Sequence, residues 1–169
     1  CDAGVTPTYW QHRQFPPEFG AKLRTIHDGI DVQYFSPAPG SKLKLQTVEL
    51  DLSDAEEIVT YVGRGMESMR GFPQFMETTY KLMQQRPRLH VVVVGADRIA
   101  YGPPLPEGKG LKEAMLKKYP FDMKRLHFTG PLPYIDYRQV LRASTVHIYL
   151  TKPFVLSWSM LEAMSCGCT

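Results

Sequence analysis

The sequence predicts an α/β protein built on a doubly wound, Rossmann-like parallel sheet. From residue 57 onward, short apolar runs alternate with stretches whose apolar residues follow helical spacing. The run 89–94, Leu-His-Val-Val-Val-Val, is almost continuously β-branched, which is typical of a strand covered by helices on both faces. Alternation of this kind favours right-handed crossovers, with helices on both sides of the sheet.

Four strands and four helices are expected in turn. The helix at 71–86, for example, follows from apolar residues three or four positions apart, among them Phe72, Phe75 and Met76. The connection 96–110 exceeds the roughly two to six residues that are usual in such units, so we suspect a functional loop. Strands are expected at 57–62, 89–94, 125–129 and 146–150, and helices at 71–86, 111–119, 134–143 and from Ser159 onward.

The usual strand order for this arrangement is third, second, first, fourth, and the ligand crevice opens between the first and fourth strands. The loops that follow these two strands are 63–71 and 151–159. Both loops are therefore expected to converge on one site.

Residues 1–36 have a different character. Several prolines and glycines exclude a long helix, so 1–21 is expected to be irregular, with a short strand at 22–26. The stretch 36–40, Ser-Pro-Ala-Pro-Gly, is typical of a linker. We therefore divide the chain into 1–36, the remnant of one domain with its linker, and 37–169. This second domain opens with a half-exposed strand or an edge hairpin at 43–50.

Composition limits the classes of function. The net charge of +3, from 20 basic and 17 acidic residues, is too small to indicate nucleic-acid binding. No apolar run approaches the roughly 20 residues that span a bilayer, and no signal-peptide pattern opens the chain. Cys166 and Cys168 have no second pair or histidine at zinc-site spacing, so no metal site is expected. These features predict a cytoplasmic protein.

The loop 63–71 places Arg64 and Arg70 among glycines. Guanidinium groups form charge-assisted, forked hydrogen bonds with the oxygens of a pyrophosphate. On this loop alone, two solvated surface arginines are an equally good interpretation. Their expected position opposite the start of the last helix, at 157–159, favours anion binding, because a helix N-terminus directs free N–H groups toward an anion.

The last helix carries its own pattern. Ser159 and Glu162 form an S-x-x-E sequence, which predicts a capping box, with Met160, Leu161 and Met164 on the apolar face. Glu162 has an alternative role as a carboxylate that accepts hydrogen bonds from ribose hydroxyls.

Other nucleotide-binding signatures are missing from the sequence. Gly95 follows a strand but lacks the later glycines of G-x-G-x-x-G, and no P-loop pattern occurs, so a dinucleotide cofactor is not expected. The histidines His90, His127 and His147 lie within or beside apolar runs. We interpret them as packed side chains rather than as ligands.

Several short motifs follow one another along the chain. They are His27-Asp-Gly-Ile-Asp31, Val62-Gly-Arg-Gly65 with Arg70-Gly71, Val94-Gly95, His127-Phe-Thr-Gly130 and Leu161-Glu-Ala-Met-Ser-Cys-Gly167. In this order they resemble the retaining glycosyltransferases of family 4, which have the two-domain GT-B architecture. The resemblance covers nearly the whole chain. It implies that 1–36 is the tail of the N-terminal domain and that 37–169 is the nucleotide-sugar-binding domain.

The resemblance also implies roles for individual residues. In the family, the arginine of the G-R motif and a following lysine grip the donor diphosphate. Arg64 matches the first and Arg70 stands in the place of the second, so both are expected to be catalytic, stabilising charge on the leaving diphosphate without a metal. The family's ribose-binding glutamate matches Glu162, and its base-binding turn matches 129–132. The donor-binding residues implied are Gly63, Gly65, Gly130, Leu132, Ser157, Trp158, Ser159, Met160, Leu161 and Glu162.

One position departs from the family pattern. The family has an earlier glutamate that contacts the transferred hexose, and the residue eight positions before Glu162 is Phe154. Either the sugar is held otherwise, for example by backbone amides of 157–160, or the donor class differs.

The implied reaction is hexosyl transfer, with retention, from a nucleoside diphosphate sugar to an acceptor glycan or lipid-linked glycan. No cofactor and no nucleic acid are expected, and the full enzyme could associate peripherally with a membrane. A sugar-nucleotide epimerase of the same architecture and a non-catalytic nucleotide-binding domain stay open as alternatives. The missing initial Met and the stop behind the last helix suggest a fragment. We expect it to be inactive alone and to self-associate through the edge strand at 146–150.

Overall fold

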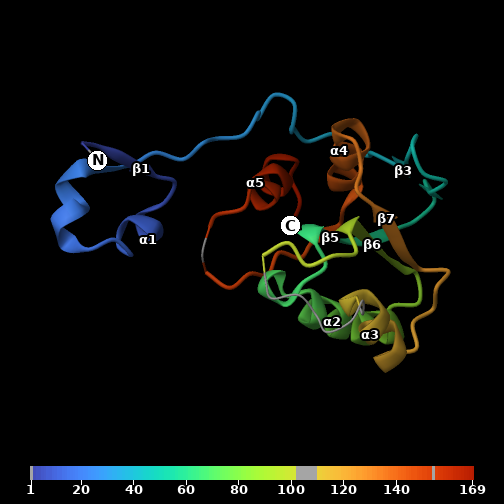
Figure 1. Ribbon diagram of the computed structural model, residues 1–169. Helices are drawn as coiled ribbons and strands as arrows, with labels where there is room; N and C mark the ends of the chain where they lie inside the picture. Colours follow the sequence, from blue (N-terminus) through green and yellow to red (C-terminus); the bar gives the residue numbers. More distant parts are fainter. Residues whose placement is uncertain (1, 102–109, 154) are drawn as a thin grey trace.

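The computed structural model describes residues 2–101, 110–153 and 155–169. Within them, a parallel sheet lies between two layers of helices (Figure 1). Its strands, in the hydrogen-bonded order β7-β6-β5-β8, follow the predicted order third, second, first, fourth. The fold class and the strand order predicted from the sequence are confirmed. The strands are β5 (Glu57–Gly65), β6 (Leu89–Ala96), β7 (Leu126–Gly130) and β8 (Val146–His147).

Helices α2 (Phe72–Gln85) and α3 (Leu111–Lys118) cover one face of the sheet, and α4 (Tyr134–Ala143) and α5 (Trp158–Ser165) cover the other (Figure 1). The valines of β6 explain this layering, because successive side chains point to opposite faces. Val91 and Val93 pack in one apolar cluster with α2, whereas Val92 and Val94 pack in another with α4. Each buried valine contributes about 1.5 kcal/mol or more, so the β-branched run stabilises both layers.

The fourth strand is shorter than predicted. We expected it to span 146–150, but β8 ends at His147. The N–H of Ile148 still donates to the carbonyl of Thr60, and beyond it the chain leaves the sheet, where the N–H of Lys152 donates to the carbonyl of Met69. A hydrogen bond to the loop after β5 thus takes the place of the strand pairing that we expected for the last residues of the fourth strand.

The first residues contain more regular structure than predicted. Instead of an irregular 1–21, the structure has β1 (Gly4–Thr6), α1 (Tyr9–His12) and a 3₁₀ helix, η1 (Pro17–Lys22), before β2 (Leu23–Thr25). The side chain of Thr8 caps α1, and β1 pairs with β2 in parallel. Figure 1 shows this part as a separate lobe, joined to the sheet domain by an extended stretch. The division of the chain at residue 36 stays a prediction.

Polar contacts fasten the linker to the sheet domain. Arg142 of α4 donates from Nε to the carbonyl of Ser36 at 2.8 Å, and the hydroxyl of Ser165 of α5 donates to the carbonyl of Phe35. After the linker, β3 (Leu43–Lys44) and β4 (Asp51–Leu52) form an antiparallel pair, so the hairpin is the alternative that the structure adopts. No helix among the described residues has the length and hydropathy that a membrane span requires.

Candidate functional site

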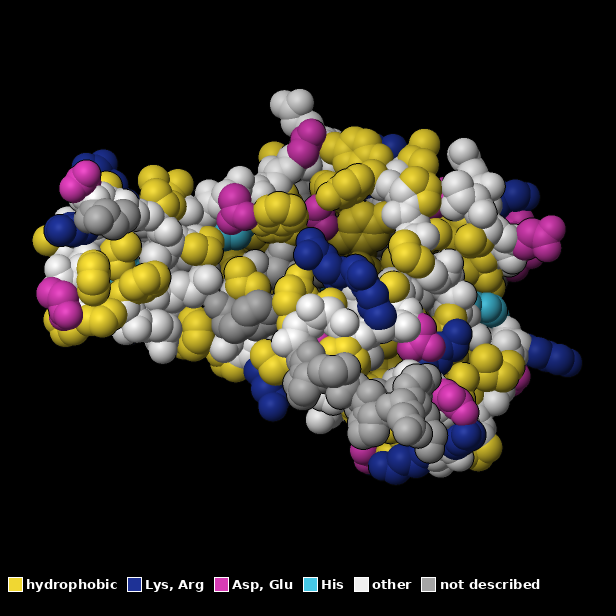
Figure 2. Space-filling view, in the orientation of Figure 1, with side chains coloured by type: hydrophobic (Ala, Val, Ile, Leu, Met, Phe, Trp, Pro, Cys, Tyr) yellow, Lys and Arg dark blue, Asp and Glu magenta, His cyan; other side chains and the backbone are white. Residues whose placement is uncertain are grey.

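A cavity of about 810 Å³ opens at the carboxyl ends of β5, β6 and β8. The loops after β5 and β8 meet beside it, since the N–H of Lys152 donates to the carbonyl of Met69 at 2.9 Å. The predicted convergence of these two loops is therefore present in the structure. In Figure 2, Lys and Arg side chains lie near the centre of the visible face, between groups of hydrophobic side chains. Three arginines line the cavity: Arg64, Arg70 and Arg98.

Two glycines permit the close backbone approach that shapes the cavity. Gly95 has φ of 137°, and a Cβ there would collide with the carbonyl of Gly63 on the neighbouring strand. Gly71 has φ of 64°, and a Cβ there would collide with the side chain of Leu150. Both conformations favour glycine. Gly95 thus permits the close approach of β6 to β5, and Gly71 permits the close approach of the loop after β5 to the segment after β8.

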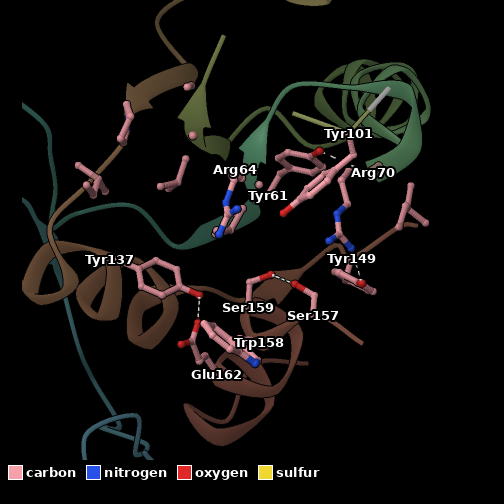
Figure 3. A pocket seen from close by; sticks show the side chains of 18 of the residues that line it. Tyr61, Arg64, Arg70, Tyr101, Tyr137, Tyr149, Ser157, Trp158, Ser159 and Glu162 are labelled. Carbon is pink, nitrogen blue, oxygen red and sulfur yellow. Dashed lines mark hydrogen bonds between the residues drawn. The ribbon is translucent and has the colours of Figure 1, made fainter. Parts of the chain in front are cut away.

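Arg70 is half-buried and has a defined orientation. Its Nη1 donates to the hydroxyl of Tyr149 at 2.9 Å and to Oγ1 of Thr151 at 3.2 Å (Figure 3). Its carbonyl accepts a hydrogen bond from the hydroxyl of Tyr61 at 3.3 Å. Burial is the main cause that raises the pKa of Tyr61, so its phenol stays protonated as a donor. A guanidinium held in this way loses little conformational freedom when it binds an anion.

Arg64 is exposed and lies at the end of β5, because the strand continues to Gly65 rather than ending at Val62 as predicted. The ring of Tyr101 lies near both arginines, with its centroid 5.9 Å from Cζ of Arg64 and 5.4 Å from Cζ of Arg70 (Figure 3). Cation–π attraction of this kind contributes about 0.5–1 kcal/mol at an exposed position. Tyr101 therefore helps to bring the two guanidinium groups to the same part of the cavity.

Glu67 fixes the backbone that carries Tyr101. Its side chain is 1% exposed. Its Oε2 accepts hydrogen bonds from the N–H groups of Ala100 at 3.1 Å and Tyr101 at 2.8 Å. A carboxylate that accepts two backbone N–H groups joins the loop after β6 to the turn after β5.

The start of α5 differs from the prediction. The N-cap is Ser157, not Ser159, and its side chain makes no capping hydrogen bond; its Oγ lies 2.8 Å from Oγ of Ser159. The predicted capping box is wrong, because Glu162 instead bonds to a neighbouring helix. The predicted apolar face is also wrong, since Met164 is 64% exposed whereas Glu162, Ala163 and Cys166 are buried. The first-turn N–H groups of α5 nevertheless lack intrahelical acceptors, as at any helix start.

Glu162 lines the cavity and is 7% exposed. The hydroxyl of Tyr137, from α4, donates to its Oε2 at 2.6 Å (Figure 3). Burial raises the pKa of Glu162, and the hydrogen bond from Tyr137 acts in the opposite direction. The result is a carboxylate in a mostly apolar part of the cavity, with one fixed donor.

Trp158 joins the start of α5 to the stretch that follows β2. Its Nε1 donates to Oδ2 of Asp28 at 2.7 Å, and both residues line the cavity. Trp158 is 49% exposed, so its ring presents an aromatic surface to whatever occupies the cavity.

The structure brings together most, but not all, of the sequence-predicted site residues. Gly65, Gly130, Met160 and Leu161 are not among the lining residues, and Phe154 lies outside the described part of the chain. The histidines His90, His127 and His147 do not line it either. The lining residues that were predicted are Gly63, Arg64, Arg70, Leu132, Ser157, Trp158, Ser159 and Glu162. Their roles stay predictions.

Sequence reasoning found Trp158 but missed the tyrosines that line the site. Tyr101 lies in the loop that was suspected of function, and Tyr149 lies in the predicted fourth strand, so position alone gave a partial signal. Tyr137 occupies a helix without any motif, and only the packing of α4 against α5 reveals it. Among the described residues, no group of three or more His, Cys, Asp or Glu side chains is placed to hold a metal ion.

Comparisons with known proteins agree with the architecture. Residues 1–35 match the sequence model of a family described as glycosyl transferase family 4 group. A search of curated proteins finds no match. The resemblance to GT-B glycosyltransferases that was inferred from the sequence is confirmed at the level of the fold, on the solved structures that follow.

Sucrose-phosphate synthase from Thermosynechococcus elongatus superposes with a TM-score of 0.61 at 22% identity, over 97% of this chain and 38% of that one. The C-terminal domain of a glycosyl transferase group 1 family protein from Francisella tularensis gives 0.60 at 20% identity, over 83% and 68%. The pneumococcal O-GlcNAc transferase, solved in complex with UDP and GlcNAc, gives 0.69 at 12% identity, over 99% and 29%. The chain thus spans well under half of the first and third of these proteins.

Proposed function

We propose that this chain supplies the donor-nucleotide site of a glycosyltransferase that transfers a hexosyl group, with retention, from a nucleoside diphosphate sugar to a glycan or lipid-linked glycan acceptor. One observation carries the proposal. Arg64 and Arg70 lie on one side of a cavity whose other side is the start of α5, at the switch point of a doubly wound sheet. The GT-B fold agrees with this function, and UDP is the nucleotide in one similar structure.

The charges of the cavity favour a diphosphate in a defined place. Two guanidinium groups and the N-terminus of a helix supply N–H donors and positive charge, which together suit a pyrophosphate. Glu162 would accept hydrogen bonds from the ribose hydroxyls, and the turn that contains Leu132 would contact the base. Arg64 and Arg70 would also stabilise the negative charge that develops on the leaving diphosphate.

Titration calorimetry with UDP, ADP and GDP tests the proposal. We expect at least one of them to bind, and Arg64→Ala to weaken that binding about 30-fold, because a charge-assisted hydrogen bond contributes roughly 2 kcal/mol. The matched control is Arg88→Ala, since Arg88 forms an exposed ion pair with Glu56 and should leave affinity unchanged. Binding of none of the three nucleotides, or equal losses in both variants, would contradict the proposed function.

Two further parts of the proposal have their own measurements. If the arginines replace a metal, EDTA should not change nucleotide affinity. If the chain lacks the acceptor machinery, it should bind donor without transferring sugar, and robust transfer by the purified chain would contradict that expectation.

A further inference from the structure

Glu162 accepts a hydrogen bond from the phenol of Tyr137, a residue that belongs to no sequence motif. The hydroxyl donates to Oε2 of Glu162 at 2.6 Å (Figure 3). Tyr137 is 8% exposed and Glu162 is 7% exposed. A hydrogen bond between a hydroxyl and an ionised carboxylate is among the stronger ones in proteins, and burial increases its strength.

Packing sets the position of the Tyr137 ring independently of Glu162. The ring makes edge-on contacts with Phe35, just before the linker, and with Tyr134, at centroid distances of 5.7 Å and 6.1 Å. It belongs to the buried cluster that joins α4 to α5, together with Leu141 and Ala163. A ring held on several sides presents its hydroxyl at one place, so Glu162 meets a donor that is already oriented.

The hydrogen bond from Tyr137 determines which ligand groups can form hydrogen bonds with Glu162. Burial, and then Glu162 itself, raise the pKa of Tyr137, so the phenol keeps its proton and acts as a hydrogen-bond donor. Donation to one oxygen favours the ionised carboxylate, which opposes the effect of burial on the pKa of Glu162. An ionised carboxylate accepts hydrogen bonds only, and this suits a vicinal diol, whose hydroxyls donate.

Other ionisable groups share the cavity with this carboxylate or lie near it in α5. Asp28, which follows β2 in the chain, and Arg64 of β5 line the same cavity, as does Tyr134 of α4. Cys166 of α5 lies close enough for the Glu162 charge to raise its pKa, although burial is the larger cause. The hydrogen bond that the structure shows to the Glu162 side chain comes instead from Tyr137.

We infer that Tyr137 is a positioning residue, which holds Glu162 as a hydroxyl acceptor and so makes the site select ribonucleotides over nucleotides that lack the 2′ and 3′ hydroxyls. This inference rests on the proposed function, because it takes the ribose of a nucleoside diphosphate as the partner of Glu162. It adds a residue from α4 to a site whose predicted members came from β5 and the loop after it, from the end of β7 and the turn after it, and from the start of α5.

The test compares UDP, ADP or GDP, whichever binds most tightly, with its 2′,3′-dideoxy counterpart. In Tyr137→Phe, we expect affinity for the ribonucleotide to fall roughly tenfold and affinity for the dideoxynucleotide to change less than about twofold. Ribonucleotide affinity should fall in acid, because Glu162 then gains a proton. This acid limb should move to higher pH in the variant, because the ionised form has lost its donor.

Three variants make the result specific. In a Glu162→Gln background, Tyr137→Phe should cause no further loss. Tyr80→Phe, which removes a phenol hydroxyl from α2, should behave as wild type, since Tyr80 does not line the cavity. Incorporation of 3-fluorotyrosine at position 137 keeps the shape and makes the phenol a stronger donor, so the acid limb should move to lower pH. This last measurement stands even if Tyr137→Phe folds poorly.

The outcomes separate the inference from the proposed function. Equal losses for both nucleotides, with unshifted pH profiles in Tyr137→Phe and in the fluorotyrosine protein, would show a packing role only and overturn the inference. Arg64-dependent nucleotide binding would in that case still support the proposed function. Failure of the wild-type chain to bind any of the three nucleotides would overturn both.

Discussion

The two sides of the cavity are held in different ways. The arginine wall, residues 64–71, is anchored by polar contacts: Glu67 accepts two backbone N–H groups, and Arg70 donates to Tyr149 and Thr151. The helix wall, residues 155–162 with the rest of α5 behind it, rests on an apolar cluster between α4 and α5. Its one buried carboxylate has a single recorded donor, Tyr137.

The difference separates two requirements of an anion site. Positive groups that must meet a diphosphate need fixed directions, and charge-assisted hydrogen bonds provide them at some cost in desolvation. A helix N-terminus already has a direction, because its N–H groups follow from the backbone, so apolar packing of the helix is enough. We therefore expect the arginine wall to depend on individual polar groups and the helix wall to tolerate polar changes, except where a charge is forced beneath it.

His147 is a position where a charge would be buried close to the chain that follows the helix wall, because its N–H donates to the carbonyl of Thr169. It lies on β8, its Nδ1 is 2.9 Å from Oγ1 of Thr60, and its buried Nε2 has no hydrogen-bond partner within 2–101, 110–153 and 155–169. Burial lowers the pKa of His147 to about 4. The unfolded chain, with a pKa near 6.5, binds the proton more readily, so stability is complete above about pH 6.5 and falls as the pH drops toward 4.

The free energy of unfolding should be lower by about 2 kcal/mol at pH 5, and by about 3 kcal/mol at pH 4, than above pH 6.5. Urea unfolding at pH 7 and pH 5 measures it. His147→Asn, which keeps a polar group near the Nδ1 position, should remove most of this dependence. His12→Gln, in the N-terminal lobe, should retain it. If the wild-type chain were equally stable at both pH values, protonation of His147 would not destabilise the protein, and the expected sensitivity to buried charge would be wrong.

Most of the fold was predictable because its signals are local. The β-branched run 89–94 predicted β6, and the helix expected at 134–143 is α4, with the bounds that the structure has. The strand order followed from the alternation of elements. The pairing of β1 with β2 was not predictable, because three-residue strands carry little periodicity and are stabilised by a non-local contact.

The site was predictable on the side where loops follow strands and less so elsewhere. Arg64 and Arg70 were found because they lie among glycines after a strand. Glu162 was expected to close a capping box, but a tertiary contact with Tyr137 competes with that local pattern. In the structure the N-cap of the helix is Ser157, two residues earlier than the pattern indicated. Residues such as Tyr137 become visible only when two helices are packed together.

Glu67→Ala tests whether the arginine wall depends on individual polar groups. Removing this buried carboxylate leaves the N–H groups of Ala100 and Tyr101 without their acceptor, so we expect a loss of about 2 kcal/mol of stability. Glu77→Ala, which removes an exposed ion pair with Lys81, should cost less than about 0.5 kcal/mol. Urea unfolding of the two variants measures the difference. Equal stability would mean that the wall does not depend on Glu67.

Tyr149→Phe should have the smallest effect and the most specific one. It removes one of the two acceptors of Arg70 Nη1, and it leaves Thr151 and the ring contact at 6.0 Å in place. The guanidinium then gains freedom that it must lose on binding, so nucleoside diphosphate affinity should fall about fivefold, or about 1 kcal/mol. In an Arg70→Ala background the same substitution should change nothing, because the residue through which it acts is gone. An equal loss in both backgrounds, measured by calorimetry, would mean that Tyr149 contacts the nucleotide itself and that Arg70 needs no brace.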